Sequence, residues 1–272
     1  MRKDEVVLGV KEQAEWWLNE RLKKVSAEKH DTMEVNPFMA PLVAALHGHD
    51  DFIELADFLL GGHFAIGHAT GFGKLVDEKI LPRVFGTAKL DAKLRKGGVL
   101  SHTAFDNIDH IVERNGEKVL LSQKASKWTI QLGQAVELNK SFKTLLDMKA
   151  EGKYAFDKIV VATFYGKEAE LTDKYRVLRG ITTGKSHDVV DISSDVRILA
   201  GKDFWTWIGQ SEHTQSWVME GILQAINAKK DALKEAANLM SEFRNSFAKR
   251  YTNSISEEGE IDWQEFLSLI NG

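Results

Sequence analysis

The 272-residue chain has no cysteine, which excludes disulfide bonds and thiolate metal sites. It has no apolar run that approaches transmembrane length, and the segment MRKDEVVLGVKEQAEWW at its start lacks the apolar core of a signal peptide. Internal repeats and low-complexity linkers are also missing from the sequence. We therefore expect a soluble, cytoplasmic protein that has no membrane partner.

The chain also lacks an excess of basic charge, since it has 36 Lys and Arg residues against 40 Asp and Glu residues. The formal net charge is −4, whereas proteins that coat nucleic acid without sequence preference are usually basic. This balance argues against a general nucleic-acid coat and still allows a DNA clamp whose basic residues line one surface. A hydrophobic content of 43% with 28% charged residues is ordinary for a globular protein, and the length allows one large domain or two smaller ones.

A β-hairpin is the clearest local signal in the chain. The pair Asn115-Gly116 separates the runs FDNIDHIVER and EKVLLSQK, which alternate and are rich in β-branched residues, and this pattern predicts a two-residue turn. In that register Asp109 lies directly opposite Ser122. Opposed residues share a sheet face, and so do residues two apart, so Asp109, Ser122 and Lys124 are predicted to project from one face.

A carboxylate and an ammonium group held side by side suit the hydrolysis of a phosphodiester. This reaction benefits from Mg²⁺, which takes oxygen ligands and neutralises phosphate charge, and a nearby lysine can orient or deprotonate the attacking water. One carboxylate makes a poor Mg²⁺ site, and Ser122 cannot supply a second. Glu137 can, because the apolar spacing over residues 130–146 predicts an amphipathic helix with Glu137 in about its second turn.

Other interpretations of these residues stay open. Glu78, in the helix-like stretch 74–85, is an alternative second acid, and the backbone carbonyl of Gln123 is a further candidate metal ligand. Asp109 and Lys124 could instead form a surface ion pair, which would contribute little stability. Glu78 and Glu137 could simply be solvent-exposed helix charges.

The spacing of these residues resembles the migrated-carboxylate variant of the PD-(D/E)xK nuclease superfamily, which several type II restriction endonucleases share. The matching elements are Asp109, the segment Ser122-Gln123-Lys124, a twelve-residue spacer and Glu137. The chain departs from the superfamily pattern at Ile108, where proline is usual, and at Ser122, where Asp or Glu is usual. At that position a serine would be a small residue that makes room for the metal and the phosphate.

Longer blocks are similar to one restriction endonuclease subfamily whose members cut the palindrome purine-GG-N-CC-pyrimidine. They are NPFMAP near Asn36, TGFGKLVDEKILPRVFG from Thr70, KWTIQL from Lys127 and LTDKYRVLRGITTG from Leu171. The resemblance implies a type II restriction endonuclease that acts on double-stranded DNA with Mg²⁺, for which Mn²⁺ can substitute.

The same resemblance assigns roles and partners. Asp109 and Glu137 would hold the metal, and Lys124 would activate the water. A palindromic target implies a homodimer with two-fold symmetry, and a restriction enzyme implies a cognate DNA methyltransferase as its functional partner. The alternatives are a structure-specific repair or junction nuclease of the same superfamily and a non-catalytic DNA-binding regulator.

Two basic segments are expected to contact DNA. Arginine and lysine read guanine in the major groove, and the same side chains also bind phosphates. In the segment after the predicted strand 158–164, we expect base contacts from Lys174, Arg176, Arg179 and Lys185. In the segment 83–96, we expect contacts with the DNA backbone from Lys89, Lys93, Arg95 and Lys96.

The order of elements predicts an α/β fold with a PD-(D/E)xK core, in which helices flank a mixed sheet. The N-terminal part reads as helices, with glycines between residues 61 and 73 breaking the pattern. A helix between the hairpin and the strand-like segment 158–164 favours a β-α-β crossover, and residues 196–200 predict another strand. We expect residues 86–200 to form the catalytic and recognition core. Residues 1–85 and 201–272 would form a helical dimerisation and DNA-clamp region, within which the interface helices stay open.

Overall fold

The computed structural model describes residues 1–27, 36–49, 52–124, 130–182, 187–256 and 260–271 of the chain. The chain divides into two compact units, each built from two separate stretches. Unit 1 comprises Met1–Gln13 and Gly73–Gln224, and unit 2 comprises Ala14–Phe72 and Ala225–Gly272. Unit 1 therefore contains the segment 86–200, which the sequence predicts to be the core, together with helical residues on both sides of it.

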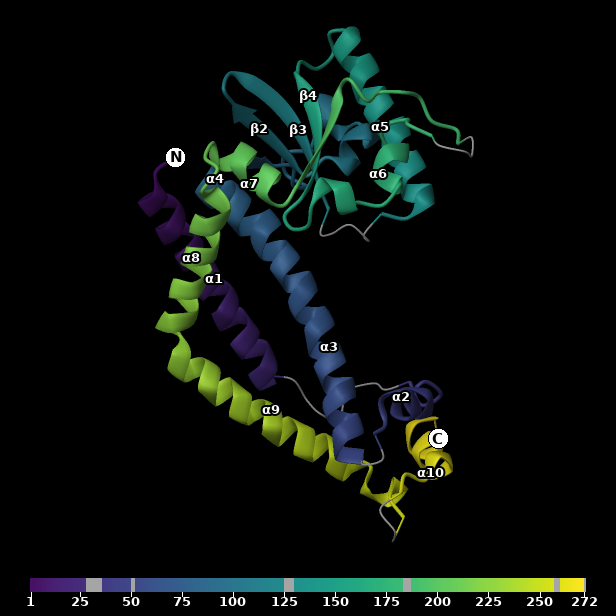
Figure 1. Cartoon of the computed structure of the whole chain (residues 1–272). Coiled ribbons are helices and arrows are strands. Elements are labelled where there is room, and N and C mark those ends of the chain that lie inside the picture. Colours follow the sequence, from purple (N-terminus) through teal and green to yellow (C-terminus); the bar gives the residue numbers. More distant parts are fainter. Residues whose placement is uncertain (28–35, 50–51, 125–129, 183–186, 257–259, 272) are drawn as a thin grey trace. The chain divides into compact units, whose positions relative to one another are not determined.

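The fold is α/β, and unit 1 holds a five-stranded mixed sheet (Figure 1). In spatial order the strands are β1 (Ala88–Lys89), β2 (His110–Arg114), β3 (Glu117–Lys124), β4 (Lys158–Thr163) and β5 (Val196–Ala200). β2 is antiparallel to both β1 and β3, whereas β3, β4 and β5 run parallel. The two later strands, the mixed sheet and the β-α-β crossover predicted from the sequence are confirmed.

The predicted hairpin is also confirmed, with the expected register. Arg114 pairs with Glu117, and His110 pairs with Leu121. Asn115 has φ 53° and Gly116 has φ 80°, and a two-residue hairpin turn of type I′ needs positive φ at both central residues. Asparagine and glycine tolerate that backbone better than other residues do, so the turn sequence determines the register of everything that follows on β3.

Helices cover both faces of the sheet. α5 (Leu132–Ala150) carries buried apolar residues at helical spacing, among them Ala135, Leu138 and Phe142, and they pack in one core with Leu120 of β3 and Val161 of β4. Figure 1 shows α5 and α6 (Lys174–Val177) on one side of the sheet, and α4 (Leu81–Phe85) and α7 (Lys202–Gly209) on the other. The residues that end β3 therefore lie between two helical layers.

The glycine-rich segment is helical, so the predicted break there is wrong. α3 (Phe52–Leu75) runs through all the glycines between residues 61 and 73. Its buried residues Ala56 and Leu60 belong to the apolar core of unit 2. A glycine inside a helix costs only about 1 kcal/mol, and burial of apolar residues near the two ends of the helix, such as Leu60 and Leu75, offsets that cost. The helix continues through η2 (Val76–Ile80), a π-helical turn, into α4.

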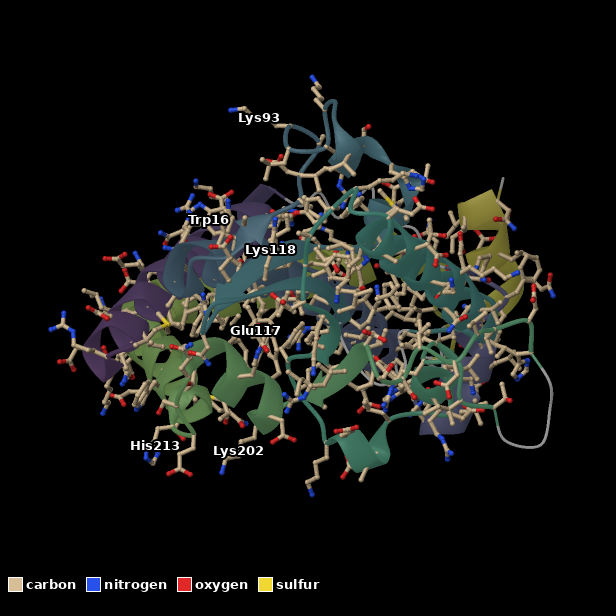
Figure 2. The ribbon with its side chains drawn as sticks, turned by 90° about the horizontal axis from the view of Figure 1, so that it is seen from above. Trp16, Lys93, Glu117, Lys118, Lys202 and His213 are labelled. Atoms are coloured by element: carbon tan, nitrogen blue, oxygen red, sulfur yellow. The ribbon has the colours of Figure 1, made fainter. Side chains whose placement is uncertain are left out.

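The remaining helices complete the two units. They are α1 (Lys3–Ala27), α2 (Ala40–His47), α8 (Thr214–Ala228), α9 (Lys230–Arg250) and α10 (Trp263–Asn271), with short 3-10 turns η3 (Val99–Ser101), η4 (Thr103–Asn107), η5 (Glu168–Glu170) and η6 (Thr252–Ser254). The start of α1 packs within unit 1, where Val6 and Val10 are fully buried. Figure 2 shows the ribbon with its side chains, seen from above.

Candidate active site

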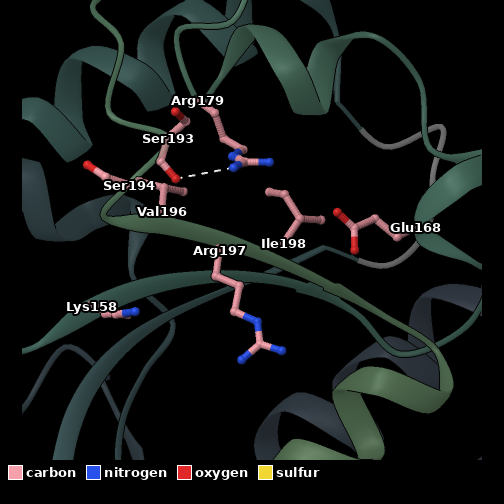
Figure 3. Close-up of a pocket in the computed structure, with 8 residues that line it drawn as sticks. All are labelled: Lys158, Glu168, Arg179, Ser193, Ser194, Val196, Arg197 and Ile198. Atoms are coloured by element: carbon pink, nitrogen blue, oxygen red, sulfur yellow. Dashed lines mark hydrogen bonds between the residues drawn. The ribbon is translucent and has the colours of Figure 1, made fainter.

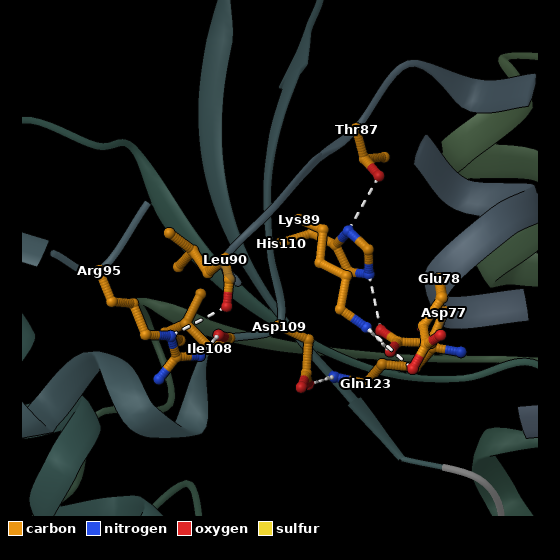
Figure 4. Close-up of polar contacts among 10 residues, drawn as sticks. All are labelled: Asp77, Glu78, Thr87, Lys89, Leu90, Arg95, Ile108, Asp109, His110 and Gln123. Carbon is orange, nitrogen blue, oxygen red and sulfur yellow. Dashed lines mark hydrogen bonds and ion pairs between the residues drawn. The ribbon is translucent and has the colours of Figure 1, made fainter. Parts of the chain in front are cut away.

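Asp109 lies between η4 and β2, and hydrogen bonds fix it to both neighbouring strand segments. Its N–H donates to the carbonyl of Leu121 at 2.8 Å, and its carbonyl accepts the N–H of Leu90 at 2.8 Å. Its carboxylate accepts the N–H of Gln123 at 2.6 Å (Figure 4). The structure thus places the Asp109 carboxylate beside the Ser122-Gln123-Lys124 segment, as the hairpin register predicts.

Lys124 and Glu137 line one cavity of about 190 Å³, although they come from different elements. Lys124 is the last residue of β3, and Glu137 lies on the exposed side of α5. Asn107, two residues before Asp109, lines the same cavity, and its Nδ2 donates to Ser141 Oγ of α5 at 2.9 Å. Within the described part of the chain neither Lys124 nor Glu137 forms an ion pair, so both charged groups remain available to a ligand.

The environment of Asp109 disfavours its charged form. Burial raises the pKa of the carboxyl group, and the nearby Asp77 carboxylate adds to that effect. The Lys124 ammonium, the Gln123 N–H and His110 act in the opposite direction but do not cancel it. A buried carboxylate with a raised pKa is a common property of functional sites, because it gains from binding a cation.

Polar atoms without partners surround the end of β3. Ser122 is fully buried, and its Oγ has no hydrogen-bond partner among the described residues. The two amide atoms of Gln123, Oε1 and Nε2, are also buried there without a partner. An unsatisfied buried polar group costs about 1–3 kcal/mol, so a cluster of them next to Asp109 indicates a place that binds a polar ligand.

A second acidic residue near Asp109 is Asp77, which the sequence interpretation did not single out. Asp77 lies on η2, and its Oδ1 is 2.8 Å from Nε2 of His110. The other ring nitrogen, Nδ1, is 3.0 Å from the hydroxyl of Thr87. Asp77 also forms an ion pair with Lys89 (Figure 4).

This network compensates the Asp77 charge. Burial opposes ionisation of Asp77, but the hydrogen bonds from His110 and Lys89 outweigh it and lower the pKa of this carboxyl group. No sequence signal marked Asp77, because the π-helical turn that carries it, a feature frequent at functional sites, is visible only in the structure.

Glu78 follows Asp77 on η2 and is exposed. Its closest cation in the described residues is Lys89, with an Nζ to Oε1 distance of 3.9 Å. The cavity that contains Lys124 is lined by Glu137 and not by Glu78. The geometry therefore favours Glu137 over Glu78 as the second acid.

Hard oxygen donors lie at the start of β2, at the end of β3 and on α5. The described residues hold no group of three or more His, Asp or Glu side chains that could bind a metal ion. Mg²⁺, however, usually takes one or two carboxylates and completes its shell with water and phosphate oxygens. The carboxylates of Asp109 and Glu137, with the carbonyl of Gln123, are hard oxygen donors that fit Mg²⁺ or Mn²⁺ better than a soft metal.

The basic residues between β1 and η3 divide into two kinds. Lys93 and Lys96 are exposed and make no ion pair within the described residues, and Figure 2 shows Lys93 pointing away from the ribbon. Lys89 instead pairs with Asp77, and Arg95 donates hydrogen bonds to Leu90, Asp106 and Ile108. Only the first two therefore have the free charge expected of a phosphate contact.

The second basic segment begins in α6, which carries Lys174 and Arg176. Arg176 is exposed and lines a groove of about 740 Å³ together with Arg179. Lys174 pairs with Asp173 at 2.6 Å. Arg179 donates to the Ser193 carbonyl at 3.1 Å and lines a smaller cavity of about 260 Å³ (Figure 3). Lys185, also expected to contact DNA, lies outside the described residues.

Two cations of that smaller cavity were missed in the sequence. Lys158 begins β4 and Arg197 lies on β5, and both line the cavity with Arg179 (Figure 3). No sequence signal marked them, because each is an isolated charge at an exposed position of a strand.

Asn139 connects this segment to α5. It is buried, and its Nδ2 donates to the carbonyls of Leu178 at 3.1 Å and Val190 at 2.9 Å. Its Oδ1 accepts the N–H of Val190 at 2.9 Å. The segment that follows α6 is thus attached to the helix that carries Glu137.

No protein-family model matches the chain, and no curated protein is significantly similar to it in sequence. None of the helices in the described ranges is both long and apolar enough to cross a membrane. A relation to the PD-(D/E)xK superfamily therefore depends on the motif residues and on their arrangement.

Proposed function

We propose that this protein is a Mg²⁺-dependent endonuclease of the PD-(D/E)xK superfamily that cuts double-stranded DNA. The observation that carries the proposal is the cavity shared by Lys124 and Glu137 at the end of β3, where the N–H of Gln123, the residue before Lys124, holds the carboxylate of Asp109. Thirteen positions separate Lys124 from Glu137 in the chain, and only the β3–α5 packing brings them together. A lysine and two carboxylates arranged in this way suit phosphodiester hydrolysis.

Each residue has a defined role in this proposal. Asp109 and Glu137 hold the metal, with the Gln123 carbonyl as a third ligand, and Ser122 leaves space beside them. When bound, Mg²⁺ supplies a Lewis acid that neutralises phosphate charge and acidifies water. Lys124 orients the attacking water and accepts its proton as the general base.

The finer proposal is a type II restriction endonuclease for the palindrome purine-GG-N-CC-pyrimidine. It is supported by the sequence blocks that resemble that subfamily, of which the block from Leu171 covers the exposed Arg176. A palindromic target requires two copies of the site, so the active form would be a homodimer. A cognate methyltransferase would protect the host DNA.

Cleavage of a sequenced plasmid tests both levels of the proposal. The purified protein is incubated with the plasmid and Mg²⁺, and the fragment ends are sequenced. Ends at purine-GG-N-CC-pyrimidine would support the restriction enzyme and its subfamily, and discrete ends elsewhere would support the enzyme without the subfamily. Preference for branched or damaged DNA would favour a repair or junction nuclease. Sequence-specific binding without cleavage, over a series of metals, would favour a regulator.

Lys124→Ala should retain DNA binding and lose at least about 100-fold in cleavage rate, the usual scale for a general base. Lys118→Ala, at the opposite end of the same strand, is the matched control and should cut at the wild-type rate. Wild-type turnover by Lys124→Ala would refute the role of Lys124.

A pair of glutamine variants identifies the second acid. Glu137→Gln should cut as poorly as Asp109→Asn, whereas Glu78→Gln should remain active, because Glu78 does not line the cavity of Lys124. Single-turnover cleavage at saturating Mg²⁺ measures both. The opposite result would assign the metal to Glu78.

A further inference from the structure

Arg95 makes three hydrogen bonds around Asp109. It follows β1, and its Nε donates to the Leu90 carbonyl at 2.9 Å. Its Nη1 donates to Oδ1 of Asp106 at 2.9 Å, and its Nη2 donates to the Ile108 carbonyl at 2.9 Å. Figure 4 shows the Arg95 guanidinium beside Leu90 and Ile108.

These partners enclose the Asp109 backbone. Ile108 immediately precedes Asp109 in the chain, and Leu90 donates its own N–H to the Asp109 carbonyl at 2.8 Å. The Arg95 guanidinium therefore binds two carbonyl groups, that of Ile108, which precedes Asp109, and that of Leu90, whose N–H binds the Asp109 carbonyl. On the opposite side, Leu121 and Gln123 of β3 hold the Asp109 N–H and carboxylate.

The contacts require arginine and not merely a positive charge. The guanidinium is planar and presents its N–H groups in a fixed fork, which reaches acceptors in different directions at once. A lysine ammonium on a flexible stem cannot hold the same set. Lys93 and Lys96, on the same segment, contrast with Arg95 because they are exposed and make no ion pair with any described residue.

We propose that Arg95 is a positioning residue that fixes the carboxylate of Asp109 in the geometry needed for cleavage, and that it does not serve as a phosphate contact. The inference rests on the proposed nuclease function. A displacement of about 1 Å at a catalytic group can cost about 100-fold in rate, so loss of the three hydrogen bonds should act on the chemical step. DNA affinity should remain, because the phosphates do not meet this side chain.

Single-turnover cleavage and DNA binding at several salt concentrations test this role. Arg95→Ala and Arg95→Lys should both cut at least about 10-fold more slowly at saturating DNA, with the wild-type Kd and the wild-type salt dependence. Added guanidinium ion should restore part of the rate of Arg95→Ala and none of the rate of Arg95→Lys. Lys93→Ala/Lys96→Ala should instead raise the Kd for DNA and reduce the salt slope by about 1 per phosphate contact. Lys118→Ala, on β3, is the control and should keep the wild-type rate and salt dependence.

A reduced salt slope in Arg95→Ala with an unchanged saturated rate would overturn the proposal. Hydrogen exchange separates this failure from a failure of the nuclease function, because it needs no cleavage. If the wild-type protein cuts no DNA, the nuclease proposal fails, and the positioning role still predicts faster exchange at the Asp109 amide in both Arg95 variants. Unchanged exchange would overturn the positioning role. If Arg95→Ala does not fold, Arg95→Lys, which keeps the charge and the stem, decides alone.

Discussion

Two aspartates near the end of β3 show how environment assigns different roles to the same side chain. The Asp77 carboxylate accepts hydrogen bonds from His110 and Lys89, and these contacts lower the pKa of its carboxyl group despite burial. The Asp109 carboxylate accepts one backbone N–H, from Gln123, and burial of this side chain raises the pKa of its carboxyl group. The compensated carboxylate stabilises the fold, and the uncompensated one is available to a cation.

Asp109→Asn should raise the thermal stability of the metal-free protein at neutral pH. A carboxyl group whose pKa is higher in the folded state favours folding only while it is protonated, and that contribution is lost as the pH rises through the folded pKa. The variant should therefore unfold at a higher temperature at pH 7, and its advantage should vanish below about pH 4, where the unfolded aspartate is also protonated. Melting curves between pH 3 and 8 measure this. A lower melting temperature at pH 7 would contradict it.

Asp77→Asn should have the opposite effect. Its pKa is lowered in the folded protein, so its stabilisation is present above the ordinary aspartate pKa and disappears as the pH falls through the folded value. We expect a loss of about 2 kcal/mol at pH 7, typical for hydrogen bonds to a charged group, and a much smaller loss below about pH 3. Urea denaturation at both pH values tests this. Equal losses at the two pH values would contradict it.

At the scale of elements, the β3–α5–β4 crossover brings the candidate site together. α5 packs its apolar face on β3 and β4, which sets Glu137 beside Lys124. Asn139, two residues after Glu137, attaches the segment after α6 to the same helix. Two glycines with positive φ, Gly116 in the hairpin turn and Gly180 after α6, differ in what surrounds them. A Cβ on Gly116 would meet nothing within 4 Å, whereas one on Gly180 would lie 1.9 Å from the Val190 carbonyl oxygen.

This contrast predicts different costs for the same substitution. Gly116→Ala should lose about 1–2 kcal/mol, the cost of left-handed backbone for an L-residue. Gly180→Ala should lose clearly more, because it adds a clash with backbone atoms at Val190 to the same strain. Urea denaturation of both variants provides the comparison. Equal losses would show that the segment after α6 can move away from Gly180 at little cost.

At the scale of the whole molecule, each unit is assembled from distant parts of the sequence. Residues 1–13 belong to unit 1, where Lys3 pairs with Glu220 at 2.9 Å and Val10 is fully buried. A Cβ on Gly221 would lie 2.8 Å from the Cβ of Val10, so this glycine permits the close approach of α1 and α8. The sheet unit therefore depends on the first turns of α1.

Val10→Ala should destabilise unit 1 by about 2 kcal/mol, because it removes two buried methyl groups. Lys3→Ala, on the same helix, is the control and should have little effect, since its ion pair is exposed. Hydrogen exchange across residues 73–224 measures the result. A change confined to α1 would show that the sheet does not depend on it.

The sequence by itself determined the features that rest on local chemistry. The Asn115-Gly116 turn fixed the hairpin register, and with it the position of Asp109 beside Lys124, because few residue pairs accept positive φ at both positions. The apolar runs at residues 158–164 and 196–200 likewise predicted β4 and β5, and helical spacing of apolar residues predicted the helix that carries Glu137. These signals are short in range and do not depend on the rest of the chain.

Only the tertiary structure decided the features that depend on packing. α3 stays helical through its glycines, against their local preference, and is held by apolar residues buried near its two ends. Folding engaged Arg95 with Leu90 and Ile108, where the sequence had predicted a contact with the DNA backbone. It also paired Asp77 with His110, although the sequence had not singled out Asp77. A side chain's partners come from distant segments, so its role as contact, support or ligand follows from the assembled fold and not from its spacing in the chain.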